Sequence, residues 1–195
     1  MPKKSAALAV AVALGMGLAA CATPTPYQPN LPGQKASGGY SELRLEPNRF
    51  RVNFQGNTLT SRETVEGYLL FRAAELTVQQ GFDWFAMVDR NTERDARTYI
   101  EPDPLYSPWY GPRYSFWRPS WRYYGLGYGW RTWDPFFGDP FWANRMDVRT
   151  VERFEASAEI LMGRGAKPQN DPKAFDARAV MENLRPRIQY PVATR

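Results

Sequence analysis

The sequence contains no histidine and only one cysteine among its 195 residues. Without histidine, the Ser-His-Asp and Cys-His nucleophile systems and every metal site built on an imidazole ligand are excluded. A single cysteine also excludes a disulfide bond within the chain. We therefore predict no catalytic residue of these familiar types, no metal site and no cofactor.

The first 20 residues have the pattern of an export signal. Lys3 and Lys4 are followed by 16 uncharged residues from Ser5 to Ala20. This run is shorter than the roughly 20 residues that a membrane-spanning helix needs, whereas a basic start and a short apolar run are typical of a signal peptide. Removal of residues 1–20 takes away two lysines and lowers the formal net charge from +5 to +3. No dense basic run remains, so nucleic acid is not an expected partner.

The end of this signal, Leu18-Ala19-Ala20-Cys21, resembles the lipobox of bacterial lipoproteins. The resemblance implies cleavage before Cys21 and attachment of fatty acids such as palmitate to it. Several acyl chains, at about 0.8 kcal/mol per buried methylene, hold a protein to a membrane where one chain does not. Ala22 after the cysteine resembles lipoproteins of the outer membrane, which implies a periplasm-facing location. The alternative is an ordinary signal peptide that leaves Cys21 as a free thiol.

A single domain is expected over residues 40–195. Before it, residues 21–39 are rich in proline, glycine and small polar residues, which predicts a lipidated and flexible tether. Hydrophobic periodicity predicts an α+β fold, a mainly antiparallel sheet with two helices packed on one face, plus a long irregular insert at 99–145. The predicted elements are strands over 40–45 and 49–54, a helix over 60–80, strands over 82–88 and 146–162, a helix over 170–186 and a short strand over 188–190.

Two local patterns refine this prediction. Leu43 and Leu45 alternate with charged neighbours, so they are expected on the buried face of the first hairpin. Thr60 and Glu63 have the spacing of a capping box, with Thr60 as the N-cap of the first helix. Gly81 is then the expected residue at which that helix stops.

The insert at 99–145 is unusual in composition. It holds 17 of the 29 aromatic residues of the chain, together with seven prolines, five glycines and interleaved arginines. Isoleucine, leucine and valine together number three there, so the insert lacks the aliphatic filler of a separate packed domain. Its candidate binding residues are Trp109, Tyr110, Trp117, Trp121, Tyr124, Trp130 and Trp133.

Four interpretations of these aromatic residues are open. They could form a disordered or collapsed loop that covers the domain, or a surface for an envelope protein, since Trp, Tyr and Arg dominate protein interfaces. They could stack on peptidoglycan or another polysaccharide, or they could lie at a membrane interface, where Trp and Tyr are favoured. Aromatic residues interleaved with arginine also occur in proteins that bind single-stranded nucleic acid, but the export signal disfavours that partner.

Several blocks of the chain resemble a family of small Gram-negative bacterial lipoproteins of unknown function. The longest is TSRETVEGYLLFRAAELT at 60–77, followed by blocks at 81–85, 156–163 and 176–178. The similarity covers residues 40–90 and 146–185 in addition to the lipobox, and it does not extend into the aromatic insert. It implies a fold and a location without implying an activity.

Only carboxylates remain as candidates for acid–base catalysis. Glu63 is expected to serve the helix cap, and Arg62 with Glu66 at i,i+4 is expected to form a surface pair. Arg72 and Glu75 at i,i+3 are expected to form a partly buried structural pair, while Asp83 and Asp89 could line a cleft. No spacing among them forces two carboxyl groups together, as a glycosidase requires. The leading hypothesis is a non-enzymatic, lipid-anchored envelope protein that binds through its aromatic insert. The alternative is a carboxylate-dependent hydrolase of cell-wall glycan.

Overall fold

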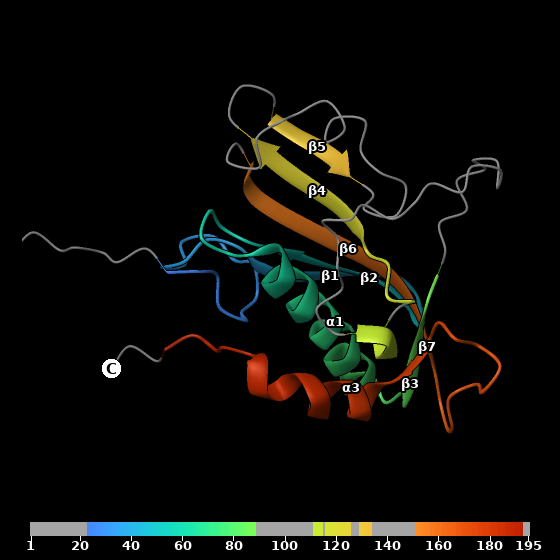
Figure 1. The fold of residues 1–195 in the computed structure, drawn as a ribbon. Helices are drawn as coiled ribbons and strands as arrows, with labels where there is room; N and C mark the ends of the chain where they lie inside the picture. The colour runs from blue at the N-terminus through green and yellow to red at the C-terminus, as the bar shows by residue number, and fades with distance from the viewer. Residues whose placement is uncertain (1–22, 89–110, 115, 126–128, 134–150, 193–195) are drawn as a thin grey trace, which may run out of the picture.

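A computed structural model describes residues 23–88, 111–114, 116–125, 129–133 and 151–192. It confirms the α+β architecture, in which two helices lie on one face of a seven-stranded, mainly antiparallel sheet (Figure 1). None of the helices in these residues is long and apolar enough to cross a membrane. The strands are β1 Gly39–Glu46, β2 Arg49–Gln55, β3 Trp84–Met87, β4 Ser120–Gly125, β5 Gly129–Trp133, β6 Val151–Gly163 and β7 Ala174–Asp176; the helices are α1 Arg62–Gln79 and α3 Ala177–Leu184, with 3-10 turns η1 Gly111–Tyr114 and η3 Arg185–Arg187.

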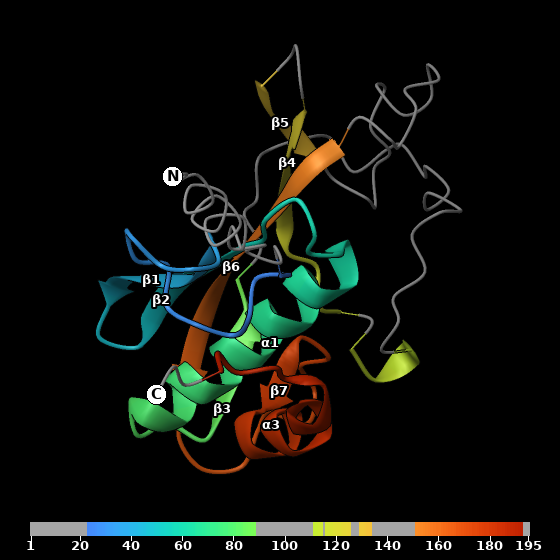
Figure 2. The ribbon, with the colours of Figure 1, turned by 90° about the vertical axis from the view of Figure 1, so that its left-hand side faces the viewer.

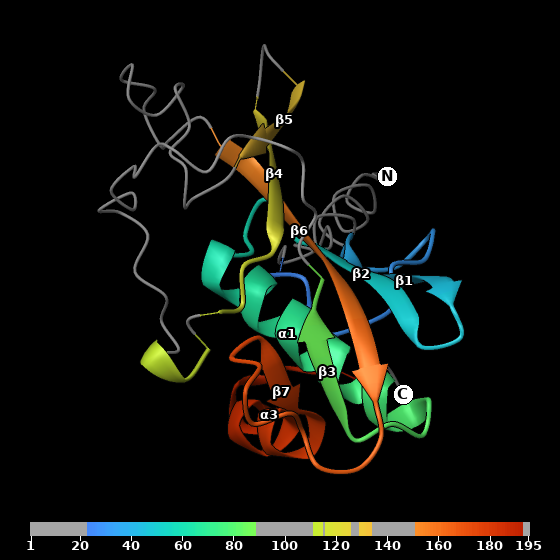
Figure 3. The same ribbon diagram turned by 90° about the vertical axis from the view of Figure 1, so that its right-hand side faces the viewer.

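The long strand β6 organises the sheet. One of its edges pairs with β2, which in turn pairs with β1. With 13 residues, β6 has room for two strands on its other edge: β4 pairs with its first half and β3 with its second half, and Figure 3 shows β4 and β3 one after the other along this edge. The outer strands β5 and β7 then pair with β4 and β3.

The core lies between this sheet and α1. Alternate residues of β2 and β6 point toward the helix, so that Val52, Phe54 and Ile160 are buried with the apolar residues of α1. Helix α3 packs beside α1, as Figure 2 shows. Full burial of each large aliphatic or aromatic side chain contributes about 1.5–3 kcal/mol, so this layer provides most of the apolar stabilisation.

The exact ends of α1 differ in part from the prediction. The N-cap is Ser61, whose hydroxyl oxygen accepts a hydrogen bond from the Thr64 backbone N–H at 3.1 Å. Thr60 is not the cap because its hydroxyl accepts a hydrogen bond from the Thr25 backbone N–H instead. At the other end, Gly81 follows the C-cap with a φ of +76°, which agrees with the expected stop.

The second helix begins later than predicted. Residues 170–172 form a turn, in which the Asp171 side chain accepts from the Lys173 N–H at 2.9 Å. Strand β7 follows, and Asp176 then caps α3 by accepting from the Ala179 N–H at 2.8 Å. Aspartate initiates turns and helices through the same side-chain acceptor, which explains the error. The expected strand at 188–190 does not form in this described part of the chain, although the Gln189 carbonyl accepts from the Tyr27 N–H at 2.7 Å.

Three further expectations are corrected. The middle of the insert at 99–145 is not irregular, since it contains β4 and β5, while most of its remainder lies outside the described residues. The tether predicted for 21–39 packs against the domain in its described part, where Thr25 and Tyr27 are buried. Leu43 and Leu45 are exposed, because β1 turns Glu42 rather than its leucines toward the helix side.

Candidate binding surface

The sheet has a second face that differs from the helix-covered one. Along β6, Ala156, Ala158, Ile160 and Met162 point toward α1, so the alternate residues point to the opposite side. None of the helices in the described residues packs on this side, which we call the open face. Its side chains on β6 are mostly polar or charged: Arg153, Glu155, Ser157, Glu159 and Leu161.

Four side chains form a row on the open face across β5, β4 and β6. The Tyr124 and Trp130 rings lie 5.5 Å apart between centroids. The guanidinium carbon of Arg122 is 4.9 Å from the centre of Trp130, and that of Arg153 is 5.0 Å from the centre of Tyr124. We call these four residues the arginine–aromatic ladder.

Strand register explains why the ladder forms. Tyr124 is directly opposite Trp130 on β5 and directly opposite Arg153 on β6, so all three side chains share one face. Arg122 is two residues before Tyr124 and therefore lies on the same face, diagonal to Trp130. Each contact between a guanidinium and a ring is worth about 0.5–1 kcal/mol at an exposed site. The ladder therefore adds modest stability while it presents rings and positive charge to solvent.

Two glutamates of β6 lie on the open face, Glu155 beside the ladder and Glu159 farther along the strand, opposite β2. Arg122 Nη1 is 3.8 Å from a Glu155 carboxylate oxygen. Glu159 accepts hydrogen bonds from Arg49 Nε at 2.6 Å and from Arg51 Nη2 at 3.4 Å. Burial alone would raise the pKa of Glu159, but these two arginines outweigh it and lower the pKa. Glu159 is thus an ionised acceptor held by arginines, which does not suit a general acid.

The structure separates the predicted binding residues into three groups. Tyr124 and Trp130 meet in the ladder and are partly exposed. Trp117 and Trp121 are completely buried in the core, where Trp117 packs edge-on against Phe85. These two indoles present no face to a ligand. Two further candidates, Trp109 and Tyr110, lie outside the described residues, as do the side chain of Trp133 and the predicted lipid attachment site, Cys21.

A buried polar cluster lies on the helix side of the sheet. Arg72 is 6% exposed and donates to Glu75 at 2.5 Å and to Glu42 at 2.8 Å. Its guanidinium carbon is also 4.3 Å from the centre of the Tyr40 ring. Tyr27 donates its hydroxyl proton to Glu75 at 2.5 Å. The predicted structural pair between Arg72 and Glu75 is therefore confirmed.

The protonation states in this cluster suit a structural role. Burial, reinforced by the hydrogen bond to Glu75, raises the pKa of Tyr27, so this hydroxyl stays a donor. Burial lowers the pKa of Arg72, but the hydrogen bonds with Glu42 and Glu75 and the contact with Tyr27 outweigh burial and raise it. The cluster thus joins the amino-terminal segment, β1 and α1 through charge-assisted hydrogen bonds.

Glu66 and Asp83, two further carboxylates of the described residues, differ from the predictions made for them. Glu66 is 1% exposed, so the expectation of a surface pair with Arg62 is wrong. Asp83 accepts from Arg178 and from the Gly165 N–H, both at 2.7 Å, and these bonds lower its pKa. Asp83 therefore connects the turn before β3 to the loop after β6 and to α3. Asp89 lies outside the described residues, so the cleft predicted for Asp83 and Asp89 stays a prediction.

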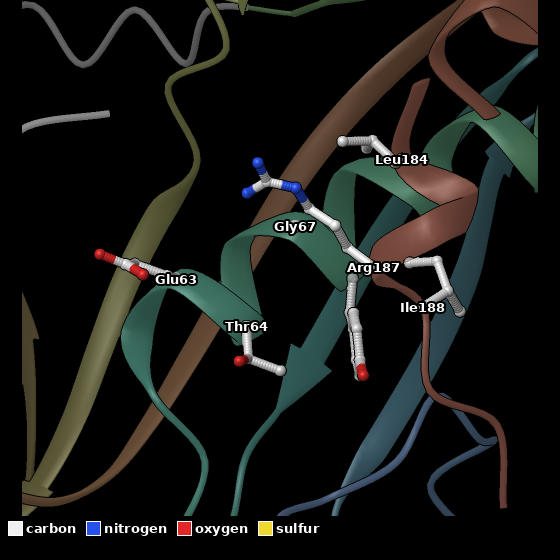
Figure 4. A pocket seen from close by; sticks show the side chains of 7 residues that line it. Glu63, Thr64, Gly67, Leu184, Arg187 and Ile188 are labelled. Carbon is white, nitrogen blue, oxygen red and sulfur yellow. The ribbon is translucent and has the colours of Figure 1, made fainter. Parts of the chain in front are cut away.

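Two pockets formed by the described residues do not bring carboxylates together. The first encloses about 120 Å³ between α1 and η3, and Glu63 is the one carboxylate in its lining. Figure 4 shows the Glu63 carboxylate pointing away from the other lining side chains. A second pocket, beside α3, likewise has one carboxylate, Glu182. The first is also smaller than the roughly 300–1,000 Å³ of typical small-molecule sites.

The arginines of the ladder were not among the predicted binding residues. Their alternation with aromatic residues in the insert was the available signal, since Arg122 and Tyr124 are two positions apart and therefore share a strand face. Arg153 could not be assigned in the same way, because its place beside Tyr124 depends on the pairing of β4 with a strand far along the chain.

Comparison of the chain with models of known families, with characterised proteins and with solved structures finds no match in any of the three. The resemblance of residues 60–77 to small bacterial lipoproteins therefore stays a prediction.

Proposed function

We propose that this protein is a lipid-anchored component of the cell envelope, held at the outer membrane through Cys21, and that the arginine–aromatic ladder is its binding surface. Lipidation is supported by the lipobox resemblance. The single observation that supports the binding surface is the row of two rings and two guanidinium groups on the open face. Tryptophan, tyrosine and arginine are the residue types that contribute most to binding energy at interfaces.

The composition of the ladder indicates the chemistry of a partner. Arg122 and Arg153 carry two positive charges, and Glu155 beside them carries one negative charge. Guanidinium groups pair with carboxylate and phosphate oxygens, while the adjacent rings favour partly apolar groups. The proposed partner is therefore an envelope component with anionic groups, and peptidoglycan, another polysaccharide, an envelope protein and the lipid surface all meet this requirement.

Lipid anchoring is tested with Cys21→Ser in the cell that produces the protein. We expect the natural chain to incorporate labelled palmitate and to fractionate with the outer membrane, and we expect the variant to lose both properties. A variant that is processed normally and still fractionates with membranes would show that Cys21 is not the anchor.

Binding by the ladder is tested with Trp130→Ala, with Leu43→Ala as the control. Both residues lie on outer strands of the same sheet, Trp130 on β5 and Leu43 on β1, but Leu43 is not part of the ladder. We expect only the ladder variant to weaken binding to its envelope component. Point substitutions are required, because deletion of the whole insert would also remove the buried Trp117 and Trp121.

The hydrolase hypothesis predicts a different result. A glycan hydrolase releases soluble fragments from purified peptidoglycan, and a single carboxylate substitution such as Glu63→Gln would abolish the release. A binding protein associates with the polymer and dissociates from it without cleaving it, so no soluble fragments appear. Turnover that depends on one carboxylate would therefore replace our proposal.

A further inference from the structure

The amino-terminal segment leaves the domain at a defined position. The Asn57 side-chain amide donates to the Thr23 carbonyl at 2.7 Å, and the Asn57 backbone N–H donates to the Thr25 hydroxyl at 2.8 Å. The Thr25 N–H in turn donates to the Thr60 hydroxyl at 2.8 Å, and Thr25 is 1% exposed. The segment is thus attached to the loop between β2 and α1 from Thr23 onward.

This attachment leaves very little chain between the domain and the predicted anchor. Only Ala22 separates Cys21 from Thr23. Because a residue spans at most about 3.6 Å, the Cα atoms of Cys21 and Thr23 are no more than about 7 Å apart. If acyl chains hold Cys21 at a bilayer, the loop between β2 and α1 must therefore lie at the surface of that bilayer.

The arginine–aromatic ladder is at the same end of the sheet. The Gly56 N–H donates to the Phe154 carbonyl at 2.9 Å, and the next residue of β6, Arg153, is opposite Tyr124. Strands β2, β6 and β4 are successive neighbours, each about 4.8 Å from the next, so the ladder begins roughly 10 Å from the loop. In Figure 1 the first blue residues, the start of β6 and the end of β4 are all on the left side of the molecule.

We propose that this end of the sheet, formed by the loop over residues 57–61 and the arginine–aromatic ladder, docks on the anionic headgroups of the bilayer that holds the Cys21 lipid. This inference rests on the proposed lipidation and identifies the partner of the proposed binding surface. Arg122 and Arg153 pair with lipid phosphates, and Trp130 and Tyr124 enter the interfacial layer that tryptophan and tyrosine favour.

The loop itself supports the same partner. Leu59 is 50% exposed at its tip, beside the residues that hold Thr23 and Thr25. An exposed leucine next to a lipid attachment site adds apolar burial at the interface. Because Thr23 is no more than about 7 Å from the acylated Cys21, this end of the domain is held against the lipid surface itself, which favours headgroups as the partner.

The orientation is tested with the full lipidated protein in vesicles of phosphatidylcholine and phosphatidylglycerol. Cys21 is the only cysteine and is consumed by acylation, so an introduced cysteine is the single labelling site. A fluorophore is placed at Leu59→Cys or, as a control, at Lys167→Cys, which is exposed in the loop after the opposite end of β6. With a quencher on the lipid headgroups, we expect several-fold stronger quenching at position 59 than at position 167.

The results distinguish this inference from the proposed function. A protein that does not float with the vesicles would overturn lipid anchoring and the inference together. A protein that floats but shows equal quenching at both positions, or stronger quenching at position 167, would overturn the docking alone.

The role of the ladder is tested by removing its charges. The double variant Arg122→Ala and Arg153→Ala is expected to lose most of the quenching of a fluorophore at Thr132→Cys, an exposed position opposite Arg122 on β5, in anionic vesicles. Position 59 does not serve for this test, because Cys21 holds it near the bilayer whether or not the ladder docks. Arg164→Ala is the matched control, because Arg164 also lies over a ring, that of Phe82, at the opposite end of β6. If the double variant keeps the quenching at position 132, the ladder does not dock on headgroups and the inference is wrong; a loss of binding to purified peptidoglycan in the same variant would identify peptidoglycan as the partner.

Discussion

Tyr123 and Tyr124 are adjacent in the chain but belong to different regions of the molecule. Tyr123 is 1% exposed and faces the helices with Trp121, whereas Tyr124 faces the open side with Trp130. The alternation of side chains along β4 produces this separation. The aromatic insert thus contributes side chains both to the core and to the surface. The density of aromatic residues in the sequence does not predict which of them are buried.

Substitution of a buried side chain on the helix-covered face is expected to give the largest loss of stability. Trp121→Ala removes a fully buried indole that packs edge-on against Phe154, so we expect a loss of about 3–5 kcal/mol in the free energy of unfolding. Denaturant unfolding measures this loss. Trp121→Phe, which keeps part of the volume, should lose less, and equal losses for the two variants would contradict the importance of packing there.

Loss of a contact that attaches the amino-terminal segment to the helix side is expected to give the next largest loss of stability. Tyr27→Phe removes the hydroxyl that donates to Glu75 but keeps the ring between Tyr68 and Phe71. Since a hydrogen bond to a charged group contributes about 1.5–3 kcal/mol, we expect a loss in this range. Hydrogen exchange should also become faster at the Tyr27 amide. Unchanged exchange there would show that the ring alone holds the segment.

The ion pairs of the open face predict a pH dependence. The pKa of Glu159 is lowered below its ordinary value of 4.5 in the folded protein. Its contribution to the free energy of unfolding is therefore fully present above about pH 4.5 and is lost as pH falls through the folded-state pKa. Glu159→Gln should therefore be less stable than the natural protein at pH 7, by about 1 kcal/mol, and the difference should shrink in acid. A difference that grows as pH falls would contradict the assigned arginine partners.

The ladder is expected to give the smallest change in stability. Trp130→Ala removes one contact with a guanidinium and one ring contact at a partly exposed site, so we expect a loss of about 1 kcal/mol or less. The same variant should nevertheless reduce binding to anionic vesicles. A loss as large as that of Trp121→Ala would show that the two faces do not differ, and that the ladder is mainly structural.

The regular elements were largely predictable from local patterns. The periodicity of β2 and α1 marked their positions, and Gly81 marked the end of the helix. The start of α3 was predicted incorrectly, because Asp171 and Asp176 are equally able to accept backbone hydrogen bonds. Leu43 was assigned to the wrong face, because alternation shows that two faces differ without showing which one a neighbouring helix covers.

The candidate surface was predictable only in part. Tyr124 and Trp130 were among the expected binding residues, together with Trp117 and Trp121, which are buried. All four share the same aromatic context of proline, glycine and arginine in the chain. The pairing of β4 with β6 separates them, and this pairing joins residues more than 25 positions apart, beyond the range of local patterns.

The sequence by itself determined the expected anchor and the type of fold, because the lipobox resemblance and hydrophobic periodicity are properties of short stretches of chain. The absence of histidine likewise excluded whole classes of catalysis without reference to a structure. Only the tertiary structure decided which rings are buried, that Arg153 completes the ladder, and that Thr23 leaves the domain at the same end of the sheet. These features depend on contacts between distant segments, which form only when the sheet brings them together.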